Sequence, residues 1–194
     1  YHDASPRIEE LDWAATPMGD LTLRRRRDPV AGVEVFEVKL GEEFLMSSLF
    51  TVAEIELATR ALQLLDGEDL DVVVGGLGLG FSLRATLDLL GPRGKVVVAE
   101  QSPSVVEWNR VHVGDLAGRP LADPRVSVRV GDVRERIREA RAAYDLILLD
   151  VDNGPDALIH EANAGLYDAT GIVACHRALT ERGALAVWAL GPDD

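Results

Sequence analysis

The stretch Asp71-Val-Val-Val-Gly-Gly-Leu-Gly-Leu-Gly80 decides the fold, because a short apolar run leads directly into a turn with four glycines. The run is rich in β-branched residues and lacks polar alternation, which is typical of a buried parallel strand. The following segment, 81–90, carries Leu83, Leu87 and Leu90 at the spacing of an amphipathic helix. A strand, a glycine turn and a helix start form either a site for a phosphate, carboxylate or nucleoside, or a purely structural turn.

After this turn the chain alternates between apolar strands and amphipathic helices. We expect strands at 71–75, 95–100, 126–130, 145–150 and 184–190, and helices at 80–90, 103–113, 133–142 and 168–181. Repeated units of this kind specify a doubly wound, mostly parallel Rossmann-like α/β sheet with right-handed crossovers. An earlier helix is expected at 52–65, with Thr51 and Glu54 as a capping box at its start.

Residues 1–50 predict a small N-terminal antiparallel β appendage, separate from a Rossmann-like domain at 51–194. The first ten residues are polar and are expected to form a loose lead-in. Alternation is clearest at 33–40, and turn residues on either side favour three or four strands. The run Arg24-Arg-Arg-Arg27 is interpreted as a strand end with solvated charges rather than an anion-binding patch.

Composition and charge limit the class of function. The chain has 194 residues, is 47% hydrophobic and carries a net charge of −13, which argues against nucleic-acid binding and favours a small or cationic ligand. No apolar stretch approaches the roughly 18 residues of a membrane span, so we predict a cytoplasmic protein. Cys175 is the only cysteine, which excludes an internal disulfide and a cysteine-rich zinc site, and we predict no metal. Because the first residue is Tyr1 rather than Met, we expect the natural N-terminus to precede it.

Ligands of open parallel sheets bind beyond the carboxyl ends of the strands, so the residues at those ends are the candidates. Glu100 ends its strand about twenty residues after the glycine turn, the spacing of an acid that accepts hydrogen bonds from ribose hydroxyls. Asp132 follows the next strand and is either a ligand contact or only a helix cap. Asp150 follows a fully apolar run, which favours a ligand or catalytic role.

Three segments of the C-terminal half, with these strand ends, resemble one known family. They are 123–132 (Asp-Pro-Arg-Val-Ser-Val-Arg-Val-Gly-Asp), 144–150 with Asp152, Gly154-Pro155 and Leu166-Tyr167 after it, and 178–185 (Ala-Leu-Thr-Glu-Arg-Gly-Ala-Leu). The pattern resembles the class I S-adenosylmethionine-dependent methyltransferase fold and, within it, the spermidine synthase branch. The resemblance extends from about residue 33 to residue 190. The aminopropyltransferases of the spermidine synthase branch also carry a small N-terminal β domain, like the one expected here.

The resemblance implies a set of site residues and ligands. The ligand would be S-adenosylmethionine or its decarboxylated form, and the acceptor a small molecule, such as a cationic amine. Asp150 and Asp152 would be catalytic. The ligand-binding residues would be Gly76, Gly78, Gly80, Glu100, Gln101, Asp132, Val133 and Asp150.

Several positions depart from the spermidine synthase pattern. Leu79 stands where the family has an aspartate that holds the amine of the aminopropyl donor, and Ser102 stands where it has a second acid. The second aspartate of the catalytic loop is shifted to Asp152, and the gate segment has no clear counterpart in 44–50. The chain stops at Asp194, before the antiparallel pair that usually completes the sheet, and exposed sheet edges would then be compatible with a homodimer.

Three hypotheses follow. The first is a spermidine synthase-like transferase that moves a methyl or aminopropyl group to an unidentified acceptor. The second is a non-catalytic relative that binds a nucleoside or a protein partner, which the substituted positions favour and the retained acids disfavour. The third, an NAD-dependent dehydrogenase, has little support, because the matches after the third and fourth strands belong to the adenosyl-ligand pattern.

Overall fold

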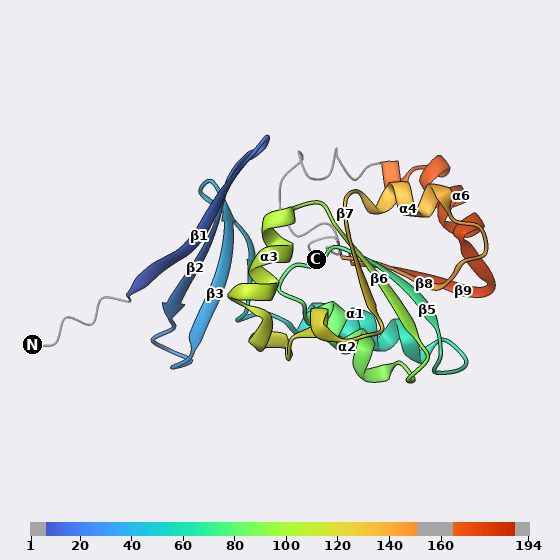
Figure 1. Cartoon of the computed structure of the whole chain (residues 1–194), viewed down its shortest axis with the longest axis horizontal. Helices are drawn as coiled ribbons and strands as arrows, with labels where there is room; N and C mark the ends of the chain where they lie inside the picture. Colours follow the sequence, from blue (N-terminus) through green and yellow to red (C-terminus); the bar gives the residue numbers. More distant parts are fainter. Residues whose placement is uncertain (1–6, 151–164, 189–194) are drawn as a thin grey trace, which may run out of the picture. The chain divides into compact units, whose positions relative to one another are not determined.

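The computed structural model describes residues 7–150 and 165–188 (Figure 1). The chain divides into two compact units, Tyr1–Thr51 and Val52–Asp194, and each is described by itself.

The first unit is a four-stranded antiparallel sheet in the order β1-β2-β3-β4. Its strands are β1 (Ile8–Thr16), β2 (Gly19–Arg27), β3 (Glu34–Leu40) and β4 (Glu43–Ser47). Leu23 of β2 pairs with Val38 of β3 on one face of the sheet, Val35 pairs with Arg26 on the other, and the three apolar side chains are buried. The expected loose lead-in is wrong from Ile8 onward, because β1 pairs with β2 and sets Ile8 opposite Arg26.

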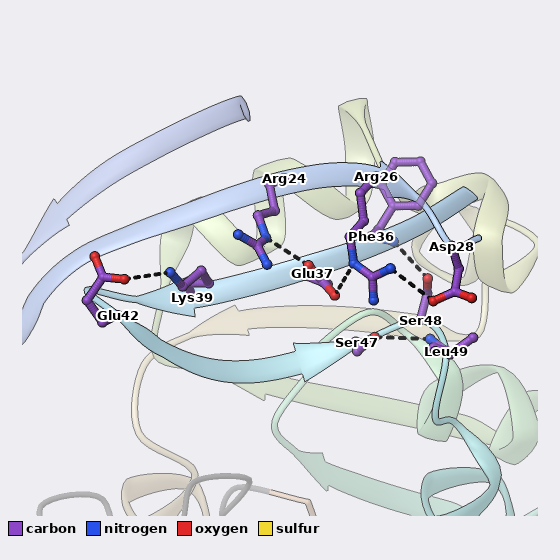
Figure 2. A network of polar contacts seen from close by, with 10 residues as sticks. All are labelled: Arg24, Arg26, Asp28, Phe36, Glu37, Lys39, Glu42, Ser47, Ser48 and Leu49. Carbon is purple, nitrogen blue, oxygen red and sulfur yellow. Dashed lines mark hydrogen bonds and ion pairs between the residues drawn. The ribbon is translucent and has the colours of Figure 1, made fainter. Parts of the chain in front are cut away.

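Arg24 and Arg26 of β2 form ion pairs with carboxylates of the same unit (Figure 2). Glu37 on β3 is 4% exposed, and its carboxylate accepts from Arg24 Nε at 2.7 Å and from Arg26 Nε at 2.9 Å. Arg26 also pairs with Asp28 at 2.9 Å. Because the side chains of Arg24 and Arg26 are only 18% and 22% exposed, the prediction of solvated charges is wrong for these two. The run is a structural ion-pair network, which leaves little free positive charge for an anion.

The second unit contains five parallel strands in the order β7-β6-β5-β8-β9. They are β5 (Asp71–Gly75), β6 (Lys95–Glu100), β7 (Val126–Val130), β8 (Tyr144–Leu149) and β9 (Leu179–Val187). In chain order this is 3-2-1-4-5, so the order reverses between β5 and β8. A ligand site is expected at this reversal. The predicted α/β class and parallel sheet are confirmed, as is the separate antiparallel sheet before it.

Helices cover both faces of the parallel sheet (Figure 1). On one face α1 (Val52–Gln63) packs against α2 (Phe81–Leu89), and on the other α4 (Val133–Glu139) packs against α6 (Ala169–Ala178). Helix α3 (Pro103–Val111) contacts β6 and leads into two short 3-10 turns, η1 (Gly114–Ala117) and η2 (Pro120–Ala122). The central strands are almost fully buried, as their apolar runs predict.

The end of the described chain differs from the prediction. Helix α6 ends at Ala178 rather than at residue 181, and β9 begins immediately at Leu179 rather than at residue 184. Leu179 pairs with Tyr144 of β8, and the Thr180 hydroxyl donates to Asp145 Oδ1 at 3.0 Å. Pairing with β8 therefore overrides the helical preference of the residues that follow.

Candidate functional site

The glycine turn between β5 and α2 has a backbone that side chains rarely permit. Gly76, Gly78 and Gly80 have φ of 92°, 54° and 91°, all in the left-handed region. Gly75 has an ordinary φ, but a Cβ there would lie 3.0 Å from Leu149 Cδ2 and 3.1 Å from the methyl carbons of Val133. The glycines are thus required by backbone conformation and by close packing of the neighbouring strand end.

Backbone hydrogen bonds join this turn to the strand ends on both sides. The amide of Gly76 donates to the carbonyl of Ala99 on β6 at 2.8 Å, and the amide of Asp150 donates to the carbonyl of Gly75 at 2.9 Å. The amide of Gly131 donates to the carbonyl of Glu100 at 2.9 Å. The predicted site residues on four strands therefore meet at one edge of the sheet.

Glu100 is fixed by two backbone amides. Its Oε2 accepts from the Leu77 amide of the glycine turn at 2.9 Å, and its Oε1 accepts from the Ser102 amide at 2.9 Å. Ser102 also caps helix α3, since its hydroxyl accepts from the amide of Val105 at 3.3 Å. Each carboxylate oxygen keeps a second lone pair, so Glu100 is oriented beside the turn and still has capacity to accept from a ligand hydroxyl.

Asp132 is mainly engaged within the protein. Its Oδ1 accepts from the Arg134 amide at 2.8 Å as the N-cap of α4, and its Oδ2 pairs with the Arg134 guanidinium at 2.6 Å from Nε. Burial acts to raise the pKa of Asp132, but these hydrogen bonds and the charges of Arg134 and Arg138 outweigh it and lower the pKa. The helix cap expected from the sequence is present, while a ligand contact by Asp132 stays a prediction.

The environment of Asp150 differs from that of Asp132, because only one of its carboxylate oxygens is hydrogen-bonded and its pKa is raised. Its Oδ2 accepts from the Ser82 hydroxyl of α2 at 2.7 Å, whereas its Oδ1 is shielded from solvent and has no hydrogen-bond partner among the described residues. Burial raises the pKa of Asp150 from 3.8 to about 6; the Ser82 hydrogen bond lowers it, and the charge of Glu54 raises it further. A half-satisfied carboxylate that titrates near neutrality is suited to accepting a proton.

Ser82 and Glu54 are site residues that the sequence analysis missed. Ser82 is 2% exposed at the start of α2, and its hydroxyl lies 3.5 Å from the backbone carbonyl of Glu54 at the start of α1. The capping box of Thr51 and Glu54 stays a prediction, while Glu54 Oε2 is shielded from solvent with no hydrogen-bond partner among the described residues. The order of the elements could have indicated these residues. Helix α1 leads into the start of β5, so the first turn of α1 lies at the opposite edge of the sheet, where the strands end and ligands bind.

The remaining predicted residues differ in what they can offer. Leu79 is 6% exposed and packs in the core, so it supplies no polar group. Gln101 is exposed, and Val133 is 4% exposed with its side chain against Gly75, which leaves only its backbone for a ligand. Asp152, like Asp156, lies outside the described residues, and its predicted catalytic role is untested.

Asn109 of α3 is hydrogen-bonded to the backbone of the glycine turn. It is 4% exposed, and its Nδ2 donates to the Gly78 carbonyl at 2.8 Å and to the Val105 carbonyl at 2.9 Å. A Cβ at Gly80 would lie 3.2 Å from Asn109 Oδ1. This helix therefore holds the turn in its left-handed conformation, a role without an obvious sequence signal.

Over 7–150 and 165–188, no group of three or more His, Cys, Asp or Glu side chains is arranged to hold a metal ion. No helix within the same ranges is both long enough and apolar enough to cross a membrane.

Parallel strands in the order 3-2-1-4-5, with the candidate side chains at their carboxyl ends, define a Rossmann-like domain of the class I methyltransferase type. The chain shares this fold with solved spermidine synthases. The enzyme from Thermotoga maritima superposes with a TM-score of 0.70 at 20% identity, over 92% of this chain and 56% of its own. A spermidine synthase in complex with the transition state analogue AdoDATO superposes with a TM-score of 0.73 at 19% identity, over 92% and 57%. A probable spermidine synthase from Corynebacterium glutamicum gives 0.68 at 16% identity, over 94% and 64%.

The sequence shows the same likeness. A polyamine aminopropyltransferase from Korarchaeum cryptofilum is 29% identical over 112 residues, which is 57% of this chain and 34% of that protein. No protein-family model matches the chain. The chain thus spans about a third of this curated relative and a little over half of two of these solved structures. It is spermidine synthase-like in its fold, as the resemblance predicted.

Proposed function

We propose that the chain binds an S-adenosyl donor at the glycine turn and transfers an aminopropyl or methyl group to an amine acceptor beside Asp150. The observation that carries the proposal is the Asp150 carboxylate, which is buried at the strand-order reversal with Oδ1 unpaired among the described residues and with a pKa of about 6. The named activity of the aminopropyltransferase relative supports the aminopropyl form of the reaction.

The residues beside the turn fit an adenosyl ligand. The left-handed glycines keep side chains away from the turn, and the first amides of α2 lack a side-chain cap. Glu100 is held by two amides and still has free lone pairs for ribose hydroxyls. When bound, the donor supplies a sulfonium whose carbon is already activated for displacement.

Asp150 then acts on the acceptor. An amine attacks only when neutral, so its lone pair forms the new carbon–nitrogen bond as the carbon–sulfur bond breaks and a neutral thioether leaves. The proton released from nitrogen passes to Asp150 Oδ1, while Ser82 keeps the other oxygen oriented. A carboxylate with a pKa of about 6 is mostly ionised at pH 7 and can accept this proton.

The nature of the transferred group follows from a direct comparison of donors. The protein is incubated with S-adenosylmethionine or with its decarboxylated form and a mixture of diamines, and products are identified by mass spectrometry. Methylthioadenosine as the product shows aminopropyl transfer, and S-adenosylhomocysteine shows methyl transfer, which the apolar Leu79 favours.

An experiment on ligand binding tests the proposal without requiring turnover. An adenosyl ligand present at a hundredfold excess over its dissociation constant should stabilise the fold by about 2.7 kcal/mol. If neither donor nor methylthioadenosine raises the unfolding temperature, the proposal is wrong. Turnover, where present, should rise with pH to a plateau above about pH 6, the pKa of Asp150, and should be lost in Asp150→Asn.

A further inference from the structure

The glycine turn contains one peptide whose orientation is not set by the turn itself. Residues Leu77 to Gly80 form a β-turn, in which the Gly80 amide donates to the Leu77 carbonyl at 2.9 Å. The peptide that joins Gly78 to Leu79 is the central peptide of this turn. Turn types differ mainly in the orientation of that peptide, and a glycine permits more than one of them. A contact from outside the turn is therefore needed to fix it.

Asn109 of α3 makes this contact. Its Nδ2 donates to the Gly78 carbonyl at 2.8 Å and to the Val105 carbonyl at 2.9 Å. Because a peptide unit is planar and trans, its carbonyl and its amide point in opposite directions. Asn109 holds the carbonyl of the central peptide, so the Leu79 amide in the same peptide points away from α3.

The first peptide of the glycine turn has the same geometry. The amide of Gly76 donates to the carbonyl of Ala99 on β6 at 2.8 Å. The carbonyl of Gly75, in the same peptide, accepts from the amide of Asp150 at 2.9 Å. In that peptide, the group that points away from β6 is thus bonded on the side of the site where Asp150 lies.

The Leu79 amide lacks such a partner. It donates no hydrogen bond to any group within 7–150 and 165–188. Leu79 as a whole is 6% exposed, so water has little access to its backbone. Folded proteins rarely leave a buried amide without an acceptor. The orphaned amide therefore indicates that a ligand supplies the acceptor.

Stability alone does not account for an asparagine at this position of α3. Asparagine is unfavourable inside a helix, and Asn109 is 4% exposed. Its Oδ1 is shielded from solvent and has no hydrogen-bond partner among the described residues. An apolar side chain of similar size would fill the same space without an unsatisfied polar atom. What an apolar side chain cannot supply is the hydrogen bond to the Gly78 carbonyl.

We propose that Asn109 is a positioning residue of the adenosyl-ligand site, an inference that rests on the proposed function. By holding the Gly78 carbonyl, it fixes the Leu79 amide as a hydrogen-bond donor to the side chain of the bound ligand. S-adenosylmethionine offers a strong acceptor on that side chain, its carboxylate, whereas the decarboxylated form does not. The turn thereby favours S-adenosylmethionine, in the same direction as the apolar side chain of Leu79.

Calorimetric titration of the wild type, Asn109→Ala, Asn109→Asp and Val106→Ala tests this role. One probe is S-adenosylhomocysteine, which carries the carboxylate. The other is methylthioadenosine, which shares the adenosyl group and the thioether but has no carboxylate. Asn109→Asp keeps the shape of the side chain and sets an oxygen against the Gly78 carbonyl. Val106 is 2% exposed on the same helix, so Val106→Ala removes buried contacts without removing a hydrogen bond to the turn.

We expect Asn109→Ala to bind S-adenosylhomocysteine about threefold to tenfold more weakly, the factor by which loss of one neutral hydrogen bond lowers the population of the competent turn. Asn109→Asp should lose more affinity, and both variants should bind methylthioadenosine as the wild type does. Val106→Ala should unfold at a lower temperature and bind both probes normally.

A second measurement on the wild type does not depend on the folding of a variant. Hydrogen exchange at the Leu79 amide, followed by NMR, should slow when S-adenosylhomocysteine binds and should not change with methylthioadenosine.

Three results overturn the inference. In the first, Asn109→Ala binds both probes as the wild type does, or loses affinity for both by the same factor, as a purely structural role would require. In the second, the wild type binds methylthioadenosine, but S-adenosylhomocysteine does not bind or leaves exchange at Leu79 unchanged; the adenosyl site then stands without this contact. In the third, the wild type binds no adenosyl compound, and the proposed function fails with the inference.

Discussion

Replacing Asp150 with asparagine should stabilise the protein while removing its proposed base. Burial raises the pKa of Asp150 from 3.8 to about 6, so the folded state holds this proton more tightly than the unfolded chain does. The resulting stability is complete below pH 3.8 and is lost as the pH rises through about 6. A rise of about 2 in pKa corresponds to about 3 kcal/mol, which is the cost of the ionised group at neutral pH.

Asparagine resembles the protonated acid in shape and remains neutral at every pH, so the variant avoids this cost. We expect the free energy of unfolding of Asp150→Asn to exceed that of the wild type by about 3 kcal/mol at pH 8 and by little near pH 4. Urea titrations of both proteins at several pH values between 4 and 8 measure the difference. Comparing the two proteins removes the contributions of other carboxylates, such as Asp123, whose pKa the Arg125 side chain helps to lower to about 2.

Asp115→Asn is the matched control. Asp115 is 79% exposed and pairs with Arg119 at 2.6 Å, so this change should shift stability by less than about 1 kcal/mol at every pH. If Asp150→Asn is less stable than the wild type at pH 8, or if its effect does not vary with pH, Asp150 is not the strained acid described above.

Two more substitutions test the supports of the site and of the N-terminal sheet. Glu100→Ala frees the amides of Leu77 and Ser102 and removes the predicted ribose contacts, so methylthioadenosine should bind about a hundredfold more weakly by calorimetry. Glu107→Ala, at an exposed position on α3, should bind normally, and equal affinity of the two variants would refute the role of Glu100. Glu37→Gln leaves Arg24 and Arg26 without their shared carboxylate and should destabilise the first unit by about 3 kcal/mol, measured as faster hydrogen exchange in β2 and β3. The exposed Glu34→Gln should have a much smaller effect, and unchanged exchange in Glu37→Gln would show that the network contributes little.

The fold was largely predictable, because its signals are local. The apolar run 71–75, its glycine turn and the leucine-spaced segment after it specify strand, turn and helix without reference to the rest of the chain. The errors occur where tertiary pairing outweighs local preference. Residues 8–10 (Ile-Glu-Glu) were predicted to be part of a lead-in but form a strand against the arginines of β2. Residues 179–183 were predicted to be helix and turn but belong to β9, which pairs with β8.

The sequence predicted only those residues of the candidate site that stand directly at the end of a parallel strand. Glu100 and Asp150 were found because each ends a parallel strand, and all such ends lie at one edge. Ser82 and Asn109 are on helices and approach the turn through side-chain direction, which spacing alone does not reveal. Glu54 was predicted only as part of a local capping motif, which does not indicate that the start of α1 lies at the same edge as Ser82.

The acids at this edge differ in a way that separates structural from functional roles. Asp132 has both oxygens bonded to Arg134 and a lowered pKa, so its own helix already makes its charge favourable. Asp150 has a raised pKa, and it and Glu54 each keep a buried oxygen without a partner among the described residues. A protein gains no stability from such groups while they are ionised and without a partner. An acid at a strand end is thus weak evidence of activity by itself, whereas the raised pKa and the unpaired oxygen of Asp150 are what support its proposed role as the base.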